Sequence, residues 1–141
     1  MRDRLVARGR ALVAGAGEGP LLRLTHPISF WGGIDPASGR VMDPRHPQHG
    51  ASIAKTVLAL PSAVGSSSSS AIALELLRGG RAPAAILMGR VDAILALGVV
   101  VARELGYEPI PVLEVSPEAW ADLDDGTVLR VAETGDVHRV A

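Results

Sequence analysis

Short apolar runs alternate with longer amphipathic stretches in the second half of the chain. The runs typical of buried strands are 56–60, 84–88 and 111–115. Between them, residues 68–78 and 93–105 carry apolar side chains at helical spacing, and each stretch ends at a glycine. Asp92, just before the second stretch, is a favourable N-cap residue. This strand–helix–strand–helix–strand order predicts parallel strands joined by right-handed crossovers.

The two ends of the chain have the pattern of β-hairpins. Near the N-terminus, residues 5–13 and 21–24 are rich in β-forming residues and flank a turn that contains glycine and proline. Near the C-terminus, residues 127–132 and 137–141 predict a second hairpin. Hairpins on both sides of the parallel unit indicate a separate antiparallel or mixed sheet. We therefore expect an α/β protein with a β/β/α arrangement of layers, forming a single domain over residues 1–141.

A long irregular segment, residues 26–50, separates the first hairpin from the alternating half. Prolines and glycines recur through it, which rules out a long helix. Long loops within compact domains are uncommon and are usually functional or disordered. Phe30 and Trp31 lie in this segment, and such side chains need something to pack against, so we expect the segment to be ordered.

The composition excludes several classes of function. The net charge is -1 and the basic residues are spread along the chain, so neither nucleic acid nor an anionic membrane is an expected partner. The longest apolar stretch, 93–102, is far shorter than the ~20 residues of a membrane helix, and no apolar signal sequence follows the charged N-terminus. The absence of cysteine excludes disulfides and any iron–sulfur cluster held by this chain's own thiolates. These features favour a cytoplasmic protein.

The most informative local feature is a glycine followed by a run of serines, residues 65–70. The run lies between the strand ending at Leu60 and the next helix, and ligands of parallel α/β units bind at the carboxyl ends of strands. The helix N-terminus adds unpaired N–H groups that attract anions, and Gly65 lets the backbone approach a ligand closely. A flexible linker and simple helix capping are the alternatives. The run connects core elements, however, and capping accounts for only one serine, so we predict a ligand-binding loop.

Other motifs that carry chemistry are absent or incomplete. Residues 54–56 lack the glycine of a phosphate-binding loop and precede a strand, and the chain has no Gly-x-Ser-x-Gly motif of a serine hydrolase. His46 and His49 lie in the irregular segment, which also contains Asp35 and Asp43. Their spacing matches no defined metal pattern. Such loop residues more often form turns, so we expect no metal ion to be bound by this chain.

Several short segments form an ordered set of motifs along the chain. They are SFWGGIDP (29–36), GRV (39–41), DPRHP (43–47), LALPS (58–62), the serine run (65–70), LELL (74–77), APAAI (82–86) and DAILALG (92–98). Taken together, these motifs resemble the small subunit, or swivel domain, of the aconitase X family. The resemblance covers essentially the whole chain, and the combined set is specific, whereas the serine run alone is not.

The resemblance implies a fold, a partner and a reaction. The fold would be a swivelling β/β/α domain like the mobile domain of aconitase. The partner would be a large subunit that binds the family's iron–sulfur cluster, which suits the absence of cysteine here. The reactions known in the family are dehydrations, of cis-3-hydroxy-L-proline in bacterial members and of mevalonate 5-phosphate in archaeal ones.

The resemblance also assigns roles within the serine run. The family's catalytic base is a serine that follows a glycine in this loop, which maps to Ser66. Gly65, Ser67 and Ser68 would then contact the substrate through backbone and hydroxyl groups. The family pattern has arginine between two glycines at this point, whereas this chain has Val64, and the change bears on substrate choice and activity.

We therefore expect the small subunit of a heterodimeric hydro-lyase that is active only with its large subunit. Its substrate would be a hydroxy acid, either cis-3-hydroxy-L-proline or mevalonate 5-phosphate. Two other hypotheses stay open. The chain is either a non-catalytic partner subunit that has lost its chemistry with the arginine, or a stand-alone module that binds small anions at the serine loop.

Overall fold

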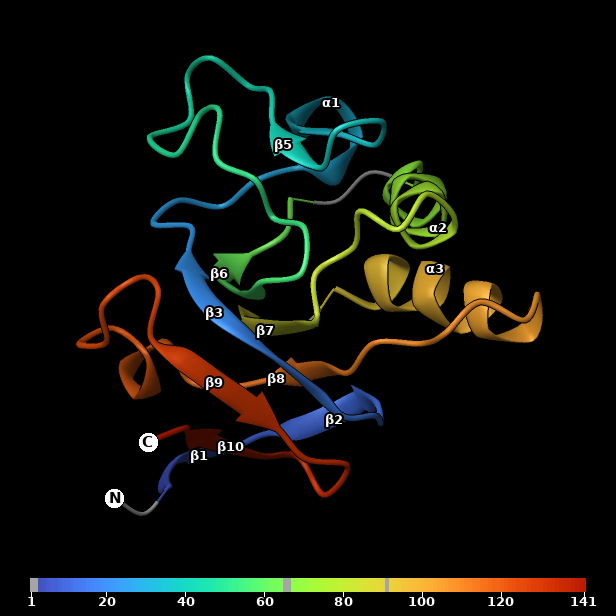
Figure 1. The fold of residues 1–141 in the computed structure, drawn as a ribbon. Helices are drawn as coiled ribbons and strands as arrows, with labels where there is room; N and C mark the ends of the chain where they lie inside the picture. Colours follow the sequence, from blue (N-terminus) through green and yellow to red (C-terminus); the bar gives the residue numbers. More distant parts are fainter. Residues whose placement is uncertain (1–2, 65–66, 91) are drawn as a thin grey trace.

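An eight-stranded sheet forms the centre of the computed structural model, which describes residues 3–64, 67–90 and 92–141 (Figure 1). The strand order is β1-β10-β9-β3-β6-β7-β8-β2. The strands are β1 (Arg4–Arg8), β2 (Arg10–Val13), β3 (Gly17–Arg23), β6 (Val57–Ser62), β7 (Ala85–Arg90), β8 (Val112–Glu114), β9 (Val128–Val131) and β10 (Asp136–Arg139). A separate two-stranded sheet pairs β4 (Ile34–Asp35) with β5 (Arg40–Val41).

The parallel unit expected from the sequence is present. Strands β3, β6, β7 and β8 run parallel to one another, and β2 closes that side of the sheet as an antiparallel edge strand. The crossovers from β6 to β7 and from β7 to β8 are α2 (Ser69–Arg78) and α3 (Ala93–Glu104). The Asp92 carboxylate accepts hydrogen bonds from the N–H groups of Ile94 and Leu95, which confirms its role as the N-cap of α3.

The predicted N-terminal hairpin is wrong. Strand β1 pairs with β10, β2 pairs with β8, and β3 lies between β9 and β6. The first half of β3 is antiparallel to β9 and its second half is parallel to β6, so the layers form one continuous sheet rather than two. Gly17 and Gly19 permit this crossing, because a Cβ atom there would lie 2.2 Å from the Ala84 carbonyl oxygen and 2.3 Å from that of Lys55.

Alternate residues of the parallel strands face two different cores. Leu58 and Leu60 of β6 belong to the core beneath the helices, whereas Val57 and Ala59 face the core beneath β9 and β10. Figure 1 shows the helices on one face of the parallel strands and the β9–β10 hairpin on the other. This arrangement confirms the β/β/α layers and the predicted C-terminal hairpin.

The two helices approach each other closely on their side of the sheet. A Cβ atom at Gly98 of α3 would lie 2.4 Å from the carbonyl oxygen of Ser70 and 3.0 Å from the Cβ of Ala73. Glycine therefore sets the distance between α3 and the first turn of α2. None of the helices described is long and apolar enough to cross a membrane. A short 3₁₀ turn, Pro117–Ala119, follows β8.

The irregular segment is ordered, as expected, but its two aromatic residues differ in solvent exposure. Phe30, which opens α1 (Phe30–Gly33), is 1% exposed in the core beneath the helices. Trp31 is 59% exposed, so the expectation that it packs inside is wrong. Trp31 has extended backbone angles and Gly32 has a φ of 82°, so α1 is kinked and consecutive side chains point in different directions.

Candidate functional site

The serine run begins at the carboxyl edge of the parallel strands. Ser62 ends β6, and the next residue, Ala63, forms a parallel bridge with Ile28. The N–H of Val64 donates a hydrogen bond to the Ile28 carbonyl oxygen at 2.9 Å. Residue 28 leads directly into α1, so residues 63–64, which precede the serine run, lie beside the start of α1. Backbone pairing with Ile28 therefore fixes Ala63 and Val64, the two residues that precede the serine run.

The serines of this run have different environments. Ser67 is exposed and Ser68 is partly buried, and both precede α2 in a turn. Ser69 and Ser70 are already helical, and the Ser70 hydroxyl donates to the Ser67 carbonyl oxygen at 3.2 Å. Gly65 and Ser66, to which the sequence assigned the close backbone approach and the catalytic base, lie outside the described residues.

Ser69 is unusual because it is fully buried at 0% exposure. Its hydroxyl oxygen has no hydrogen-bond partner in the part of the chain that the structure describes. A buried hydroxyl without a partner costs free energy, so its presence at the first residue of α2 calls for a role. The sequence did not predict this burial, because nothing distinguishes Ser69 from the other four serines of the run.

The electrostatic environment of the loop favours anions. Helix α2 has ten residues, and its first turn contains no acidic residue. The free N–H groups at the start of such a helix carry a partial positive charge. The serine hydroxyls of this turn supply further donors of small volume. Together these groups can hold a carboxylate or a phosphate, and they can stabilise a negatively charged oxygen.

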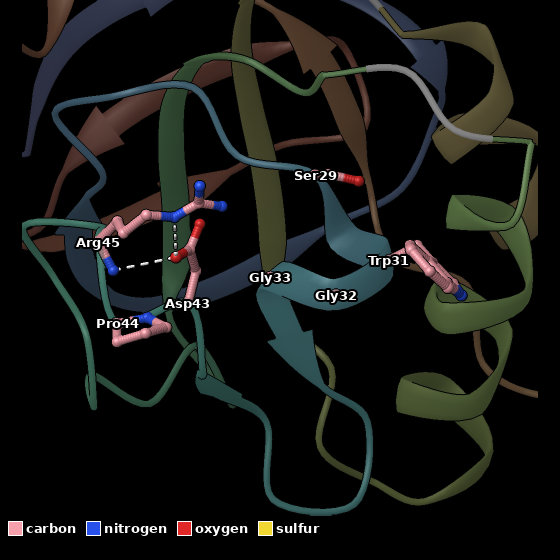
Figure 2. A pocket seen from close by; sticks show the side chains of 7 residues that line it. All are labelled: Ser29, Trp31, Gly32, Gly33, Asp43, Pro44 and Arg45. Atoms are coloured by element: carbon pink, nitrogen blue, oxygen red, sulfur yellow. Dashed lines mark hydrogen bonds and ion pairs between the residues drawn. The ribbon is translucent and has the colours of Figure 1, made fainter.

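An open depression of about 480 Å³ begins at Ser29, the residue that follows Ile28 and its bridge to Ala63 (Figure 2). Its lining comes from α1 and from the DPRHP motif: Ser29, Trp31, Gly32, Gly33, Asp43, Pro44 and Arg45. The Asp43 carboxylate accepts hydrogen bonds from the backbone N–H of Arg45 at 3.0 Å and from its guanidinium Nε at 3.3 Å. The backbone bond is the main reason that the pKa of Asp43 is lowered, and the side-chain bond adds to it.

Backbone groups hold the ring of His46 in the irregular segment. His46 is 7% exposed, and its Nδ1 accepts a hydrogen bond from the N–H of Gln48 at 3.0 Å. Its Nε2 must then carry the proton that it donates to the His26 carbonyl oxygen at 3.0 Å. Across residues 3–64, 67–90 and 92–141, no group of three or more histidine, aspartate or glutamate side chains could hold a metal ion. With no cysteine in the chain, its residues do not fit an iron–sulfur cluster.

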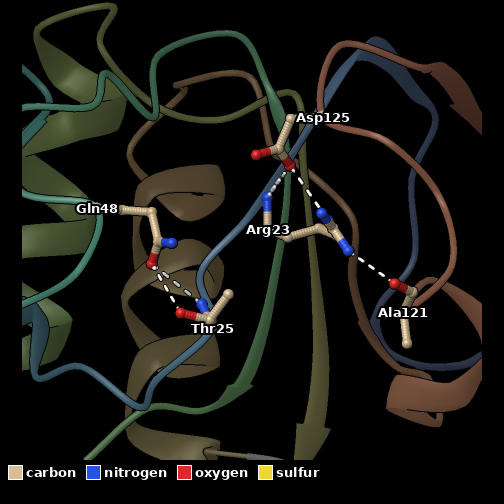
Figure 3. A network of polar contacts seen from close by, with 5 residues as sticks. All are labelled: Arg23, Thr25, Gln48, Ala121 and Asp125. Carbon is tan, nitrogen blue, oxygen red and sulfur yellow. Dashed lines mark hydrogen bonds and ion pairs between the residues drawn. The ribbon is translucent and has the colours of Figure 1, made fainter.

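A polar network ties the end of β3 to the rest of the fold (Figure 3). The Arg23 guanidinium donates to the Ala121 carbonyl oxygen at 2.7 Å and pairs with Asp125 at 3.4 Å. The backbone N–H of Thr25 donates to the Gln48 side-chain oxygen at 3.1 Å. These bonds fix the turn that leads from β3 into the irregular segment, and they engage the Arg23 side chain on the face opposite the helices.

Comparison with known proteins gives matches of three kinds: a family, individual relatives and a solved structure. Residues 6–140 match the aconitase X swivel domain family. A cis-3-hydroxy-L-proline dehydratase from Pseudomonas aeruginosa is 45% identical over 124 residues, covering 83% of this chain and 21% of that protein. A phosphomevalonate dehydratase small subunit from Methanothermobacter thermautotrophicus is 37% identical over 124 residues, covering 84% of this chain and 95% of that subunit. The crystal structure of Thermococcus kodakaraensis aconitase X in its holo-form matches with a TM-score of 0.84 and 31% identity, over 96% of this chain and 98% of that chain.

The share of each relative's length that this chain covers differs between the two groups. It spans about a fifth of the length of the cis-3-hydroxy-L-proline dehydratases. It spans nearly the whole of several phosphomevalonate dehydratase small subunits. The same structural unit therefore occurs within a longer chain in one group of relatives and as a small subunit in the other.

Proposed function

Because this chain belongs to the aconitase X swivel domain family, we propose that it is the small subunit of a two-subunit hydro-lyase acting on a 3-hydroxy carboxylic acid. The observation that supports this most directly is the position of the serine-rich turn. It lies at the carboxyl edge of the parallel strands and at the N-terminus of α2, in a fold that matches a solved aconitase X chain over almost its full length.

The substrates named for the relatives share one chemistry. Cis-3-hydroxy-L-proline and phosphomevalonate both carry a hydroxyl group on the carbon second from a carboxylate. Dehydration removes a proton from the carbon between these two groups. The electrons of the broken C–H bond form a C=C bond, and the hydroxyl leaves with its bonding electrons, so that proton and hydroxide together make one water. The carboxylate makes the proton more acidic and carries part of the developing negative charge.

This chain supplies the base and part of the anion site. Ser66 takes the proton, and the N-terminus of α2 favours the ionised form of its hydroxyl. Ser67 and Ser68, in the turn that follows, donate hydrogen bonds to the substrate, and Gly65 allows its backbone to come close. A free serine is a very weak base, so the positive end of the helix is essential to this assignment.

The remaining groups come from the large subunit. That partner would hold the iron–sulfur cluster, which would supply a Lewis acid for the departing hydroxide. The names of the archaeal relatives as small subunits imply such a partner. Closure of this domain over the large subunit excludes water from the site. We infer that this chain alone has no dehydratase activity.

A second candidate function is that of a non-catalytic partner subunit. Val64 stands where the family pattern has arginine, and its side chain is 53% exposed at the start of the serine run. An exposed valine there cannot bind an anion. In this alternative the fold and the subunit contact persist without the chemistry.

Single alanine substitutions within the serine run test the proposal. In the assembled complex, Ser66→Ala should reduce kcat by at least about a hundredfold, because loss of a general base costs about that much or more. Assembly and thermal stability should be unchanged. Ser70→Ala is the matched control, because within residues 3–64, 67–90 and 92–141 its hydroxyl donates to the Ser67 carbonyl oxygen and to no other group, and it should keep most of the activity. Full activity in Ser66→Ala with loss in Ser67→Ala would move the base by one residue, and full activity in both would refute the serine base.

A further inference from the structure

Arg90 ends β7 beside the strand from which the serine run emerges. Strands β6 and β7 are parallel, and their register places Ser62 opposite Arg90. Neighbouring strands lie about 4.8 Å apart, so these two residues are adjacent across the sheet. Both lie at the carboxyl edge, and the serine run begins within a few residues of Ser62.

The side chain of Arg90 faces the helix side of the sheet. Along β7, Leu87 faces the core beneath the β9–β10 hairpin and Met88 faces the core beneath the helices. Residue 89 returns to the hairpin side, since a Cβ atom at Gly89 would lie 2.5 Å from Pro117. Alternation therefore directs Arg90 to the helix side, as it does Ser62 on β6. The N-terminus of α2 lies on that same side.

Arg90 is also exposed and available. No ion pair joins it to any residue that the structure describes. The acidic residue closest in sequence, Asp92, is turned toward α3, where its carboxylate accepts two backbone hydrogen bonds. Glu114 on the adjacent strand β8 is paired with Arg10. An unpaired guanidinium at the end of a parallel strand is well suited to bind a carboxylate through two hydrogen bonds.

The other described cations are less suited to bind an anion at this edge, because they either lie elsewhere in the fold or are already paired. Arg23 and Arg45, the two nearest to the same edge by connectivity, are paired with Asp125 and Asp43. Besides Arg90, the cations that form no ion pair or side-chain hydrogen bond with another described residue are Arg4, Lys55, Arg81, Arg103 and Arg139. They lie in the β1–β10 pair, at the amino ends of β6 and β7, or in the last turn of α3.

We propose that Arg90 binds the substrate carboxylate, opposite the N–H groups at the start of α2. This assignment rests on the proposed function and deepens it, because it names a cation for the substrate carboxylate in a chain that has Val64 where the family pattern has arginine. With the carboxylate held between Arg90 and α2, the carbon next to it lies over the serine turn. The guanidinium also stabilises the negative charge that develops on the carboxylate as the proton is removed.

The test combines turnover with a binding measurement that does not depend on turnover. In the complex with the large subunit, Arg90→Gln should raise KM for cis-3-hydroxy-L-proline or phosphomevalonate by about ten- to a hundredfold, the loss expected for one charged hydrogen-bond pair. Arg90→Lys should recover part of that loss. Arg103→Gln, at an exposed position in the last turn of α3, is the matched control and should leave KM unchanged.

The second readout is titration of the isolated chain with acetate, followed by the amide NMR signals of residues 67–71. Shifts in the wild-type chain that are absent from Arg90→Gln support the assignment. An active complex in which Arg90→Gln keeps the wild-type KM would refute it while leaving the hydro-lyase intact. If the wild-type complex turns over neither substrate, the proposed function fails, and the titration decides alone. Identical titrations of the wild-type chain and Arg90→Gln would then refute the role of Arg90.

Discussion

At the scale of residues, neighbouring serines of the run differ in their access to solvent. Ser67 is exposed while Ser69, two residues later, is completely buried, although both belong to one run of identical side chains. The start of α2 between them separates a residue that can reach a ligand from one that cannot reach solvent. A serine in the turn is therefore a better candidate for binding a ligand than the buried Ser69.

Asp43 allows a prediction about pH. Its pKa is lowered chiefly by the hydrogen bond from the backbone N–H of Arg45, and less by the Arg45 guanidinium. The carboxylate is therefore favoured in the folded state. Its contribution to stability is present above the unfolded pKa of about 3.9 and is lost as the pH falls through the lower folded value. A carbon-13 NMR titration of the Asp43 carboxyl should give a midpoint below 3.9.

Arg45→Ala separates the two causes of this shift. The substitution removes the guanidinium but keeps the backbone N–H that bonds to Asp43. Most of the shift should therefore survive, and the conformation of the DPRHP motif should be unchanged. A return of the Asp43 pKa to its ordinary value in Arg45→Ala would show that the side chain, rather than the backbone, holds the carboxylate.

At the scale of elements, the contact between α2 and α3 positions the serine turn. A side chain at Gly98 would collide with the Ser70 carbonyl, which is backbone and cannot turn aside. Gly98→Ala gains about 1 kcal/mol of helix propensity but introduces an overpacking cost of about 1–3 kcal/mol. We expect net destabilisation, seen as a lower Tm, together with reduced activity of the complex, because the first turn of α2 must shift.

Gly15→Ala is the matched control for this experiment. A Cβ atom at residue 15 would meet Pro111 at 3.4 Å, which is an ordinary contact. Its Tm and activity should therefore stay close to those of the wild type. A Gly98→Ala protein with unchanged Tm and full activity would show that the helices can separate without affecting the site.

The sequence was sufficient for elements whose signal is local. The strands and helices of residues 56–115 were predicted because their apolar periodicity, Asp92 cap and glycine stops all lie within each element. The pairing of β3 was not predicted, because its partners β9 and β6 are distant in the sequence. Only the close backbone approaches at Gly17 and Gly19 explain that pairing, and a glycine in a strand has several other uses.

The candidate site also contains residues that could be predicted from local sequence and residues that could not. The serine run was predictable because its place between a strand and a helix can be recognised in the sequence. Arg90 was not, because its relevance depends on the register between β6 and β7 and on the face to which alternation directs it. The exposure of Trp31 was missed because two adjacent aromatic residues have the same sequence signal, and only the kinked backbone of α1 separates the buried Phe30 from the exposed Trp31.

At the scale of the whole molecule, the features of the proposed site lie together at one edge of the sheet. The serine turn, the depression beside α1 and Arg90 all lie at or next to the carboxyl ends of the parallel strands. Both described ends of the chain, in β1 and β10, lie in the hairpin layer at the opposite side of the molecule (Figure 1). A partner that completes the site at this edge would not be obstructed by those ends.

The most direct test of the proposed function is anaerobic co-expression of this chain with the large-subunit candidate from the same genome. The purified complex is assayed for loss of water from cis-3-hydroxy-L-proline and from mevalonate 5-phosphate, beside each subunit alone. We predict a stable complex that dehydrates one of the two substrates, with no activity in either subunit by itself. Failure of the two chains to associate, or a stable complex that dehydrates neither substrate, would contradict the proposed hydro-lyase.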